Sequence, residues 1–233
     1  MTLMKVSGLC KTYPAFSLKN VSFEIEKGTI MGFIGRNGAG KTTTLKALLN
    51  LIHPDSGEIE FFGKSLSENE CEIKQRVGYV VSTSGYYKRK KIRDITNVTK
   101  TFYDNWNDEN YRHYLEVFKL DEEKTPDQLS EGMKVKYNMS LALSHKAELL
   151  ILDEPTSGLD PVSRDELLDI FMQLAAKGIS ILFSTHITTD LDKCADMITY
   201  IKNGEILYSG EKSALDCNME ELMLRFEKEE IHV

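Results

Sequence analysis

The sequence lacks long apolar segments and a secretory leader. No apolar run approaches the roughly 18–20 residues that a membrane-spanning helix needs. The longest runs, such as Leu149–Leu152, have strand length and are bounded by charged residues. The N-terminus, Met-Thr-Leu-Met-Lys, has no apolar core of a signal peptide. The chain is therefore expected neither to cross a bilayer by itself nor to be secreted.

Cysteine is scarce, and its spacing is uninformative for metal binding. The 4 cysteines of the 233 residues are far apart and form no Cys-x-x-Cys pair. This spacing disfavours a zinc site and a disulfide framework, and it is typical of reduced cytosolic thiols. The 5 histidines form no ligand pair at helical spacing either.

An excess of positive charge is also missing. The chain has 36 acidic and 29 basic residues, which gives a net charge of −7. Nucleic-acid binding through bulk charge needs an excess of Lys and Arg, so that class is disfavoured. The 41% hydrophobic and 28% charged residues are ordinary for a globular chain. The length suits one domain, with or without an inserted subdomain, around a substantial core.

Hydrophobic patterning predicts strands over residues 1–34. Residues 21–26 alternate between apolar and polar side chains, the pattern of a half-buried strand. The apolar run 30–34 indicates a buried strand, and Lys27-Gly28 predicts a hairpin-type turn before it.

Helices and strands then alternate, which favours an α/β core with a mostly parallel sheet. Ser67 and Glu70 have the capping-box spacing for a short helix between two strands, and Asn203-Gly204 is a strong hairpin signal. Residues 95–128, with aromatic residues at helical spacings, predict a small helical subdomain. Helices are expected at about 41–51, 130–144 and 161–176, and strands at 58–62, 77–81, 149–153, 179–183, 197–201 and 205–209.

Residues 35–42 fit the pattern Gly-x-x-x-x-Gly-Lys-Thr, between an apolar strand and a helix. This context is the one that a phosphate-binding loop requires. Its glycines let backbone N–H groups turn toward phosphate oxygens, and the helix N-terminus adds positive potential. Lys41 would place a charge between the β- and γ-phosphates, and Thr42 would offer its hydroxyl to Mg²⁺.

Two acids, Asp153 and Glu154, follow the apolar run Leu149–Leu152. Such a position at the carboxyl edge of a parallel sheet is where these sheets bind ligands. Asp153 is expected to hold Mg²⁺ through water, and Glu154 to polarise the attacking water as general base. Two acids after a strand are ordinarily a solvated edge; the phosphate loop favours the functional interpretation.

Three further segments, 129–133, 157–160 and 184–186, follow in a characteristic order. They read Leu-Ser-Glu-Gly-Met, Ser-Gly-Leu-Asp and Ser-Thr-His. With the phosphate loop and acidic pair, the chain closely resembles the nucleotide-binding subunit of an ATP-binding cassette (ABC) transporter. The resemblance covers about residues 3–212, and Asp-Glu-Pro-Thr-Ser-Gly-Leu-Asp-Pro at 153–161 is nearly diagnostic.

The resemblance implies a P-loop NTPase fold with a RecA-like parallel-sheet core. An N-terminal antiparallel β subdomain and an inserted α-helical subdomain at about 90–145 would complete an ATPase domain over residues 1–212. Residues 213–233 would form a short C-terminal helical tail.

It also implies roles for single residues. Tyr13 would stack on adenine; the alternative is a core or surface tyrosine near a strand end. Ser130 and Gly132 would bind the γ-phosphate held by the other subunit of a dimer, although Ser130 also suits a plain helix N-cap. Asp160 would communicate across that dimer, although it would cap a helix unaided. His186 would contact the γ-phosphate and orient Glu154.

The complete expected site falls into three sets. The nucleotide-binding set adds Gly35, Asn37, Gly38, Ala39, Gly40, Lys41, Thr42 and Thr43 to Tyr13, Ser130, Gly132 and Asp160. The metal set is Thr42, Asp153 and Ser82, and the catalytic set is Glu154, His186 and Lys41.

Two departures from the family pattern stand out. Ser82 occupies the place of the usual Gln, and because serine is shorter, it would reach Mg²⁺ either directly or through an intervening water. Glu131 and Met133 replace the usual Gly and Gln of the signature segment. These changes favour pairing with a different second subunit, but homodimer and heterodimer both stay open.

The resemblance implies an ATPase that dimerises around two Mg-ATP and powers transport by a separate integral membrane (permease) subunit. The chain would lie peripherally at the cytoplasmic face of the membrane, with no nucleic-acid partner. Export of peptides or antibiotics is favoured, and import stays open. The basic run Lys88–Lys91 with Arg93 would contact that subunit or lipid headgroups, or form a solvated turn. The alternatives are an ABC ATPase without a membrane partner, of cluster-assembly type, and a nucleotide sensor.

Overall fold

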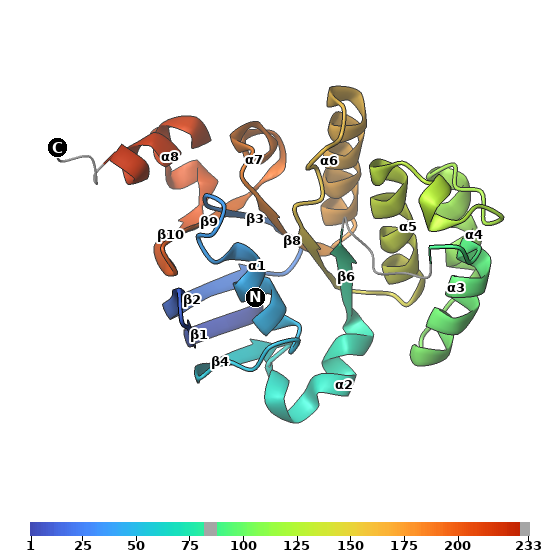
Figure 1. Ribbon diagram of the computed structural model, residues 1–233, viewed down its shortest axis with the longest axis horizontal. Helices are drawn as coiled ribbons and strands as arrows, with labels where there is room; N and C mark the ends of the chain where they lie inside the picture. The colour runs from blue at the N-terminus through green and yellow to red at the C-terminus, as the bar shows by residue number, and fades with distance from the viewer. Residues whose placement is uncertain (82–87, 229–233) are drawn as a thin grey trace.

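The computed structural model describes residues 1–81 and 88–228, and its chain folds into two sheets with helices around them (Figure 1). The strands are β1 (Thr2–Tyr13), β2 (Phe16–Glu26), β3 (Ile30–Ile34), β4 (Ser56–Phe61), β5 (Lys64–Ser65), β6 (Val77–Val81), β7 (Leu149–Asp153), β8 (Ser180–Thr185), β9 (Met197–Lys202) and β10 (Glu205–Glu211). The α-helices are α1 (Lys41–Leu48), α2 (Leu66–Arg76), α3 (Ile92–Thr99), α4 (Asp108–Val117), α5 (Glu131–Ser144), α6 (Pro161–Ala176), α7 (Thr188–Cys194) and α8 (Met219–Lys228).

The larger sheet is the predicted, mostly parallel one. Its order is β10-β9-β3-β8-β7-β6, and only the β9–β10 pair is antiparallel. The smaller sheet, β2-β1-β4-β5, is antiparallel throughout. The expected α/β architecture, with an N-terminal antiparallel unit, is thereby confirmed.

Alternate residues of the central strands enter two different cores. In β7, Leu149 and Ile151 pack with β1, β2 and α1, whereas Leu150 and Leu152 pack with α5 and α6. Both faces of the parallel sheet are therefore covered, which explains why its strands are continuous apolar runs. The carboxyl ends of β3, β7 and β8 are left as the edge that presents polar side chains.

Residues 92–144 are largely helical, as expected for the segment 95–128. Helices α3, α4 and α5 pack together to one side of the parallel sheet in Figure 1. A buried hydrogen-bond cluster joins them: Thr96 Oγ1 lies 2.9 Å from the hydroxyls of both Tyr111 and Tyr137. This subdomain carries the N-terminus of α5, where Ser130 and Gly132 lie.

Two local predictions are wrong. Lys27-Gly28 does not close a hairpin, because β2 pairs with β1 in the antiparallel sheet and β3 pairs with β8 and β9 in the parallel one. The turn instead carries the chain from one sheet to the other. Ser67 does not cap α2 either, because the helix already begins at Leu66 with Ser65 as its N-cap residue.

The hairpin at Asn203-Gly204 is confirmed, with φ values of 49° and 80°. These left-handed values match the turn type that Asn-Gly favours between antiparallel strands. Among the helices of the described part of the chain, none combines the length and apolar character required to traverse a bilayer.

Candidate functional site

The loop between β3 and α1 is tightly packed against the rest of the protein. A Cβ added to Gly35 would lie 2.3 Å from the carbonyl oxygen of Ile201. Gly40 has φ of 119°, and a Cβ there would lie 2.8 Å from Leu18 Cδ2. No other residue type fits these two positions without displacing a neighbour. The glycines thus determine the backbone path of the loop that leads into the N-terminus of α1. The first N–H groups of that helix have no partner within the helix.

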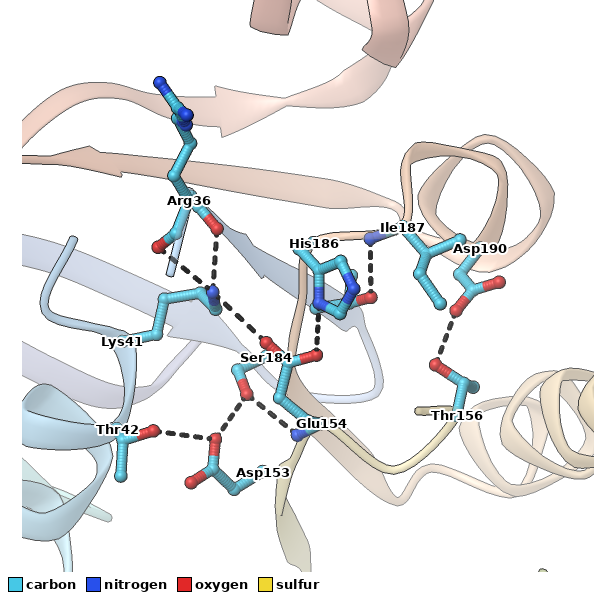
Figure 2. A network of polar contacts seen from close by, with 12 residues as sticks. Arg36, Lys41, Thr42, Asp153, Glu154, Thr156, Ser184, His186, Ile187 and Asp190 are labelled. Atoms are coloured by element: carbon cyan, nitrogen blue, oxygen red, sulfur yellow. Dashed lines mark hydrogen bonds and ion pairs between the residues drawn. The ribbon is translucent and has the colours of Figure 1, made fainter. Parts of the chain in front are cut away.

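Lys41 starts α1 and is only 5% exposed. Its Nζ donates to the carbonyl oxygen of Gly35 at 2.7 Å and lies 3.1 Å from Oε1 of Glu154 (Figure 2). The ammonium group is therefore held inside the loop, next to the acid that follows β7. A phosphate that enters the loop would meet this charge directly.

Asp153 connects the phosphate loop to β8. Its Oδ1 accepts hydrogen bonds from Thr42 Oγ1 at 3.3 Å and from Ser184 Oγ at 2.7 Å. The Ser184 hydroxyl oxygen also accepts from the backbone N–H of Glu154 at 2.9 Å. One side chain, Ser184, thus fixes both acids at the carboxyl edge of the sheet.

Glu154 and His186 are in contact. Nδ1 of His186 lies 2.8 Å from Oε2 of Glu154, while the other carboxylate oxygen faces Lys41. Glu154 has φ of 49°, a left-handed conformation that disfavours a side-chain-bearing residue and persists where the surroundings enforce it. The bond from its N–H to Ser184 is one such constraint.

These groups border a pocket of about 610 Å³, a size typical of small-molecule sites. Its lining consists of Ala15, Phe16, Arg36, Asn37, Gly38, Gly40, Lys41, Thr42, Thr43, Glu154, Ser157 and His186. A slightly larger pocket, about 680 Å³, lies at the amino ends of β3 and β9. Parallel α/β sheets bind ligands at the opposite, carboxyl edge, so the first pocket is the candidate site.

Seven of the expected residues that the structure describes do not line this pocket: Tyr13, Gly35, Ala39, Ser130, Gly132, Asp153 and Asp160. Ser130 caps α5, its Oγ accepting from the N–H of Met133 at 3.3 Å. Asp160 caps α6 by accepting from the N–H groups of Val162 and Ser163. The Ser163 hydroxyl, followed by these N–H groups, holds the pKa of the Asp160 carboxyl below the usual value. Gly35 and Ala39 belong to the loop itself and are buried. Ser82 lies outside the described residues.

Thr42 and Asp153 fit a Mg²⁺ ion chemically. Their side-chain oxygens lie 3.3 Å apart, so both could face one ion, Thr42 directly and Asp153 through one of the waters that Mg²⁺ usually keeps. Both are hard oxygen donors of the kind that this ion prefers.

Sequence reasoning missed three residues of the surrounding network: Ser184, Thr156 and Asp190. Ser184 belongs to the Ser-Thr-His segment, and its position at the end of a buried strand was the available signal. Thr156 and Asp190 are joined by a buried hydrogen bond that no local pattern indicates.

The basic segment is partly neutralised. Glu123 pairs with Lys91 at 2.7 Å and also with Arg93. Lys88, Arg89 and Lys90 are exposed, so these three residues present positive charge at the surface.

The comparisons with known proteins agree with this geometry. The model of the family described as "ABC transporter" matches residues 18–157. The chain is 37% identical over 210 residues to the bacitracin transport ATP-binding protein BcrA of Bacillus licheniformis, covering 88% of this chain and 69% of that protein. It is 33% identical over 231 residues to the lantibiotic transport ATP-binding protein SrtF of Streptococcus pyogenes, covering 97% and 99%.

Solved structures give the same picture. The structure of an ATP-binding subunit of an ABC transporter superposes with a TM-score of 0.85 at 27% identity, covering 97% of this chain and 99% of that chain. A nucleotide-free ATP-binding cassette superposes with a TM-score of 0.79 at 21% identity, which shows the shared fold.

Proposed function

Because the chain belongs to the ABC transporter family, as an ATP-binding subunit with ATPase activity, we propose that its own site residues bind and hydrolyse Mg-ATP in a dimer that powers a separate membrane subunit. The observation that carries the proposal is the Glu154 carboxylate, held between Lys41 and His186 at the mouth of the phosphate loop. A general base must lie within reach of the water that it activates, next to the phosphate site.

The proposed roles follow from these positions. Lys41 and the N-terminus of α1 bind the phosphates, and Glu154 accepts the proton of the attacking water at a carboxylate oxygen. His186 orients that carboxylate through its Nδ1 contact. Thr42 and Asp153 would hold Mg²⁺, which supplies neutralisation of charge on the phosphate oxygens.

The dimer would complete the site with Ser130 and Gly132 of the second subunit. Ser130 and Asp160 are both exposed, each at the N-terminus of a helix. Gly132 lies near Leu159 and Ser163, so the start of α5 and the segment before α6 adjoin one another. Free N–H groups at a helix N-terminus favour an anion such as the γ-phosphate of the facing subunit. Tyr13 is proposed as the stacking partner of the adenine ring.

The direct test uses the conservative change Glu154→Gln. This variant should bind ATP, lose turnover and accumulate as an ATP-bound dimer in size-exclusion chromatography. The matched control is Glu148→Gln, which removes an acid that pairs with Arg76 outside the pocket and should hydrolyse ATP like the parent. Parent-like turnover by E154Q would refute the assignment of the base.

The transported cargo is proposed to be a peptide antibiotic or a related compound, moved outward by the membrane partner. Support comes from the relatives named for bacitracin and lantibiotic transport. The −7 net charge offers no bulk attraction to nucleic acid. The domain would span residues 1–212, with the helical subdomain at about 90–145. The proposed helical tail at 213–233 includes residues 229–233, which lie outside the described part of the chain.

The exposed residues Lys88, Arg89 and Lys90 are proposed to contact the membrane subunit, which would hold the chain at the cytoplasmic face of the membrane. Reversing these three charges to Glu should leave the basal ATPase activity unchanged and abolish co-purification with a polytopic membrane protein. Lys177→Glu, at the exposed end of α6, is the control for reversing a surface charge away from this segment. Co-purification that survives the triple reversal would exclude this contact, and failure of the parent to co-purify would favour a partner-free ATPase.

A further inference from the structure

A buried hydrogen bond connects the two segments that carry the candidate base and histidine. Thr156 Oγ1 donates to Oδ2 of Asp190 at 2.6 Å, and the two residues are 0% and 1% exposed. Figure 2 shows this bond beside the Glu154–His186 contact. Neither residue lines the nucleotide pocket, so neither is placed to touch ATP.

The position of this bond along the chain is informative. Thr156 lies two residues after Glu154, in a turn closed by the bond from Ser157 N–H to the Glu154 carbonyl oxygen at 3.2 Å. Asp190 lies on the first turn of α7, four residues after His186, and its N–H donates to the Ile187 carbonyl oxygen at 3.3 Å. The Thr156–Asp190 bond therefore joins two short segments, each closed by its own backbone hydrogen bond. One segment carries Glu154 and the other carries His186.

The surroundings make this arrangement energetically demanding. Within residues 1–81 and 88–228, Oδ1 of Asp190 and Nε of Arg164 are buried without a hydrogen-bond partner. Those two atoms lie 3.9 Å apart, too far for a hydrogen bond. Burial raises the pKa of the Asp190 carboxyl, and Thr156, Arg164 and His186 oppose that rise. Replacing buried ionic groups of this kind by apolar side chains of similar size is often neutral or stabilising, so the cluster is weak evidence of a purely stabilising role.

We propose that Thr156 and Asp190 are positioning residues for ATP hydrolysis, which hold the segment after β7 and the start of α7 at the separation that keeps His186 against Glu154. The inference rests on the proposed roles of Glu154 and His186. The contact that it protects is 2.8 Å long, and a displacement of about 1 Å at a reacting group can cost on the order of a hundredfold in rate.

The principal test replaces Thr156 by Val, which keeps the shape and removes the hydroxyl. The kcat for ATP should fall at least about tenfold, while the KM for ATP stays within about twofold because the phosphate loop is untouched. Thr156→Ser retains the hydroxyl and should recover most of kcat. Thr156→Ala provides the same measurement should T156V fail to fold.

Thr96→Val is the matched control. Thr96 is also buried, and its hydroxyl bonds to Tyr111 and Tyr137 in the helical subdomain, away from the pocket. T96V should lower the melting temperature about as much as T156V and leave kcat unchanged. If T156V loses stability like T96V but retains parental kcat, the positioning role is overturned and the bond is merely structural.

A second variant tests whether the two residues act as one unit. Asp190→Ala should reduce kcat like T156V, and the T156V/D190A double variant should be no slower than D190A alone. Multiplicative losses would overturn the joint role. Failure of the proposed function gives a different result. If E154Q hydrolyses ATP like the parent, the assignment of Glu154 as the base is wrong. If E154Q and H186A lose turnover while T156V keeps the parental kcat, only the positioning role of Thr156 and Asp190 is overturned.

Discussion

Nζ of Lys41 lies 3.1 Å from Oε1 of Glu154, so the phosphate-binding lysine and the candidate base form an ion pair inside the nucleotide pocket. The two residues come from segments far apart in the sequence, one starting α1 and the other following β7 (Figure 2). In this arrangement Glu154 occupies a position next to the charge that the phosphates of ATP require. Nucleotide and carboxylate therefore compete for the same ammonium group.

This competition predicts that Glu154→Gln tightens ATP binding. Removing the carboxylate charge frees Lys41 for the phosphates and removes repulsion of the γ-phosphate. A partly exposed ion pair is worth about 1 kcal/mol, so the Kd should fall about fivefold. Titration with a fluorescent ATP analogue at protein concentrations below dimerisation measures the change. His186→Ala keeps the Lys41–Glu154 pair and should not tighten binding; an unchanged Kd in E154Q would contradict the competition.

Ser184 is predicted to matter for turnover through the two acids that it holds. Ser184→Ala removes the hydrogen bonds to Asp153 Oδ1 and from the Glu154 N–H. We expect kcat to fall about tenfold and the free energy of unfolding to fall by about 1–3 kcal/mol, because a backbone donor loses its partner.

Ser140→Ala is the control for this experiment. Ser140 is equally buried, and its hydroxyl donates to the Tyr137 carbonyl oxygen at 2.7 Å within α5. It should lose stability and keep kcat. Equal kcat values for S184A and S140A, measured on folded protein, would show that Ser184 has no influence on the site.

Tyr13 is predicted to contribute to nucleotide affinity. Tyr13→Ala should raise the KM for ATP about tenfold with a smaller change in kcat, because stacking on a base is worth about 1–3 kcal/mol. Tyr13→Phe keeps the ring and should behave like the parent. Phe16 lines the pocket whereas Tyr13 does not, so Phe16→Ala is the informative comparison: a raised KM in F16A with an unchanged KM in Y13A would transfer the stacking role to Phe16.

Asp190 predicts a specific pH dependence of stability. Burial raises the pKa of its carboxyl above the ordinary 3.8, against the opposing effects of Thr156, Arg164 and His186, while Glu154 reinforces it. The folded state then binds this proton more tightly than the unfolded state, so the carboxyl costs stability as the pH rises from about 3.8 through the folded pKa.

Asp190→Asn removes this titration. The stability of D190N relative to the parent should therefore be lowest at acid pH and increase as the pH rises through that window. Urea unfolding of both proteins between pH 4 and 7 measures the difference. A constant difference across the range would mean that the folded and unfolded states bind this proton equally.

Much of the fold follows from strong local signals. The predicted bounds of β6, β7 and α6 coincide with the structure. Pro161 begins α6, and Gly178, with φ of 87°, follows its end, so both ends carry residues whose backbone preferences fix them. Where the local signal was ambiguous, prediction failed. Asn69 has non-helical angles inside α2, and its side chain bonds to the Ser65 carbonyl oxygen, which moves the helix start away from Ser67.

The turn at Lys27-Gly28 illustrates a different limit. Its composition indicates a chain reversal, but the residues of the turn do not determine whether the strands on either side belong to the same sheet. That choice depended on partners distant in sequence, because β3 pairs with β8 while β2 pairs with β1. Backbone pairing across such separations is a property of the whole core.

The sequence by itself determined the chemistry of this protein: the glycine-rich loop with Lys41 and Thr42, the acids Asp153 and Glu154, and His186 after a buried strand. These could be found because each depends on residue type and short spacing. The tertiary structure alone decided which of these groups meet. It placed Lys41 against Glu154, seated both acids on Ser184, and joined Thr156 to Asp190 across 34 residues of chain. Such contacts arise from the packing of β3, β7 and β8 side by side, which brings residues far apart in the sequence to one edge of the sheet.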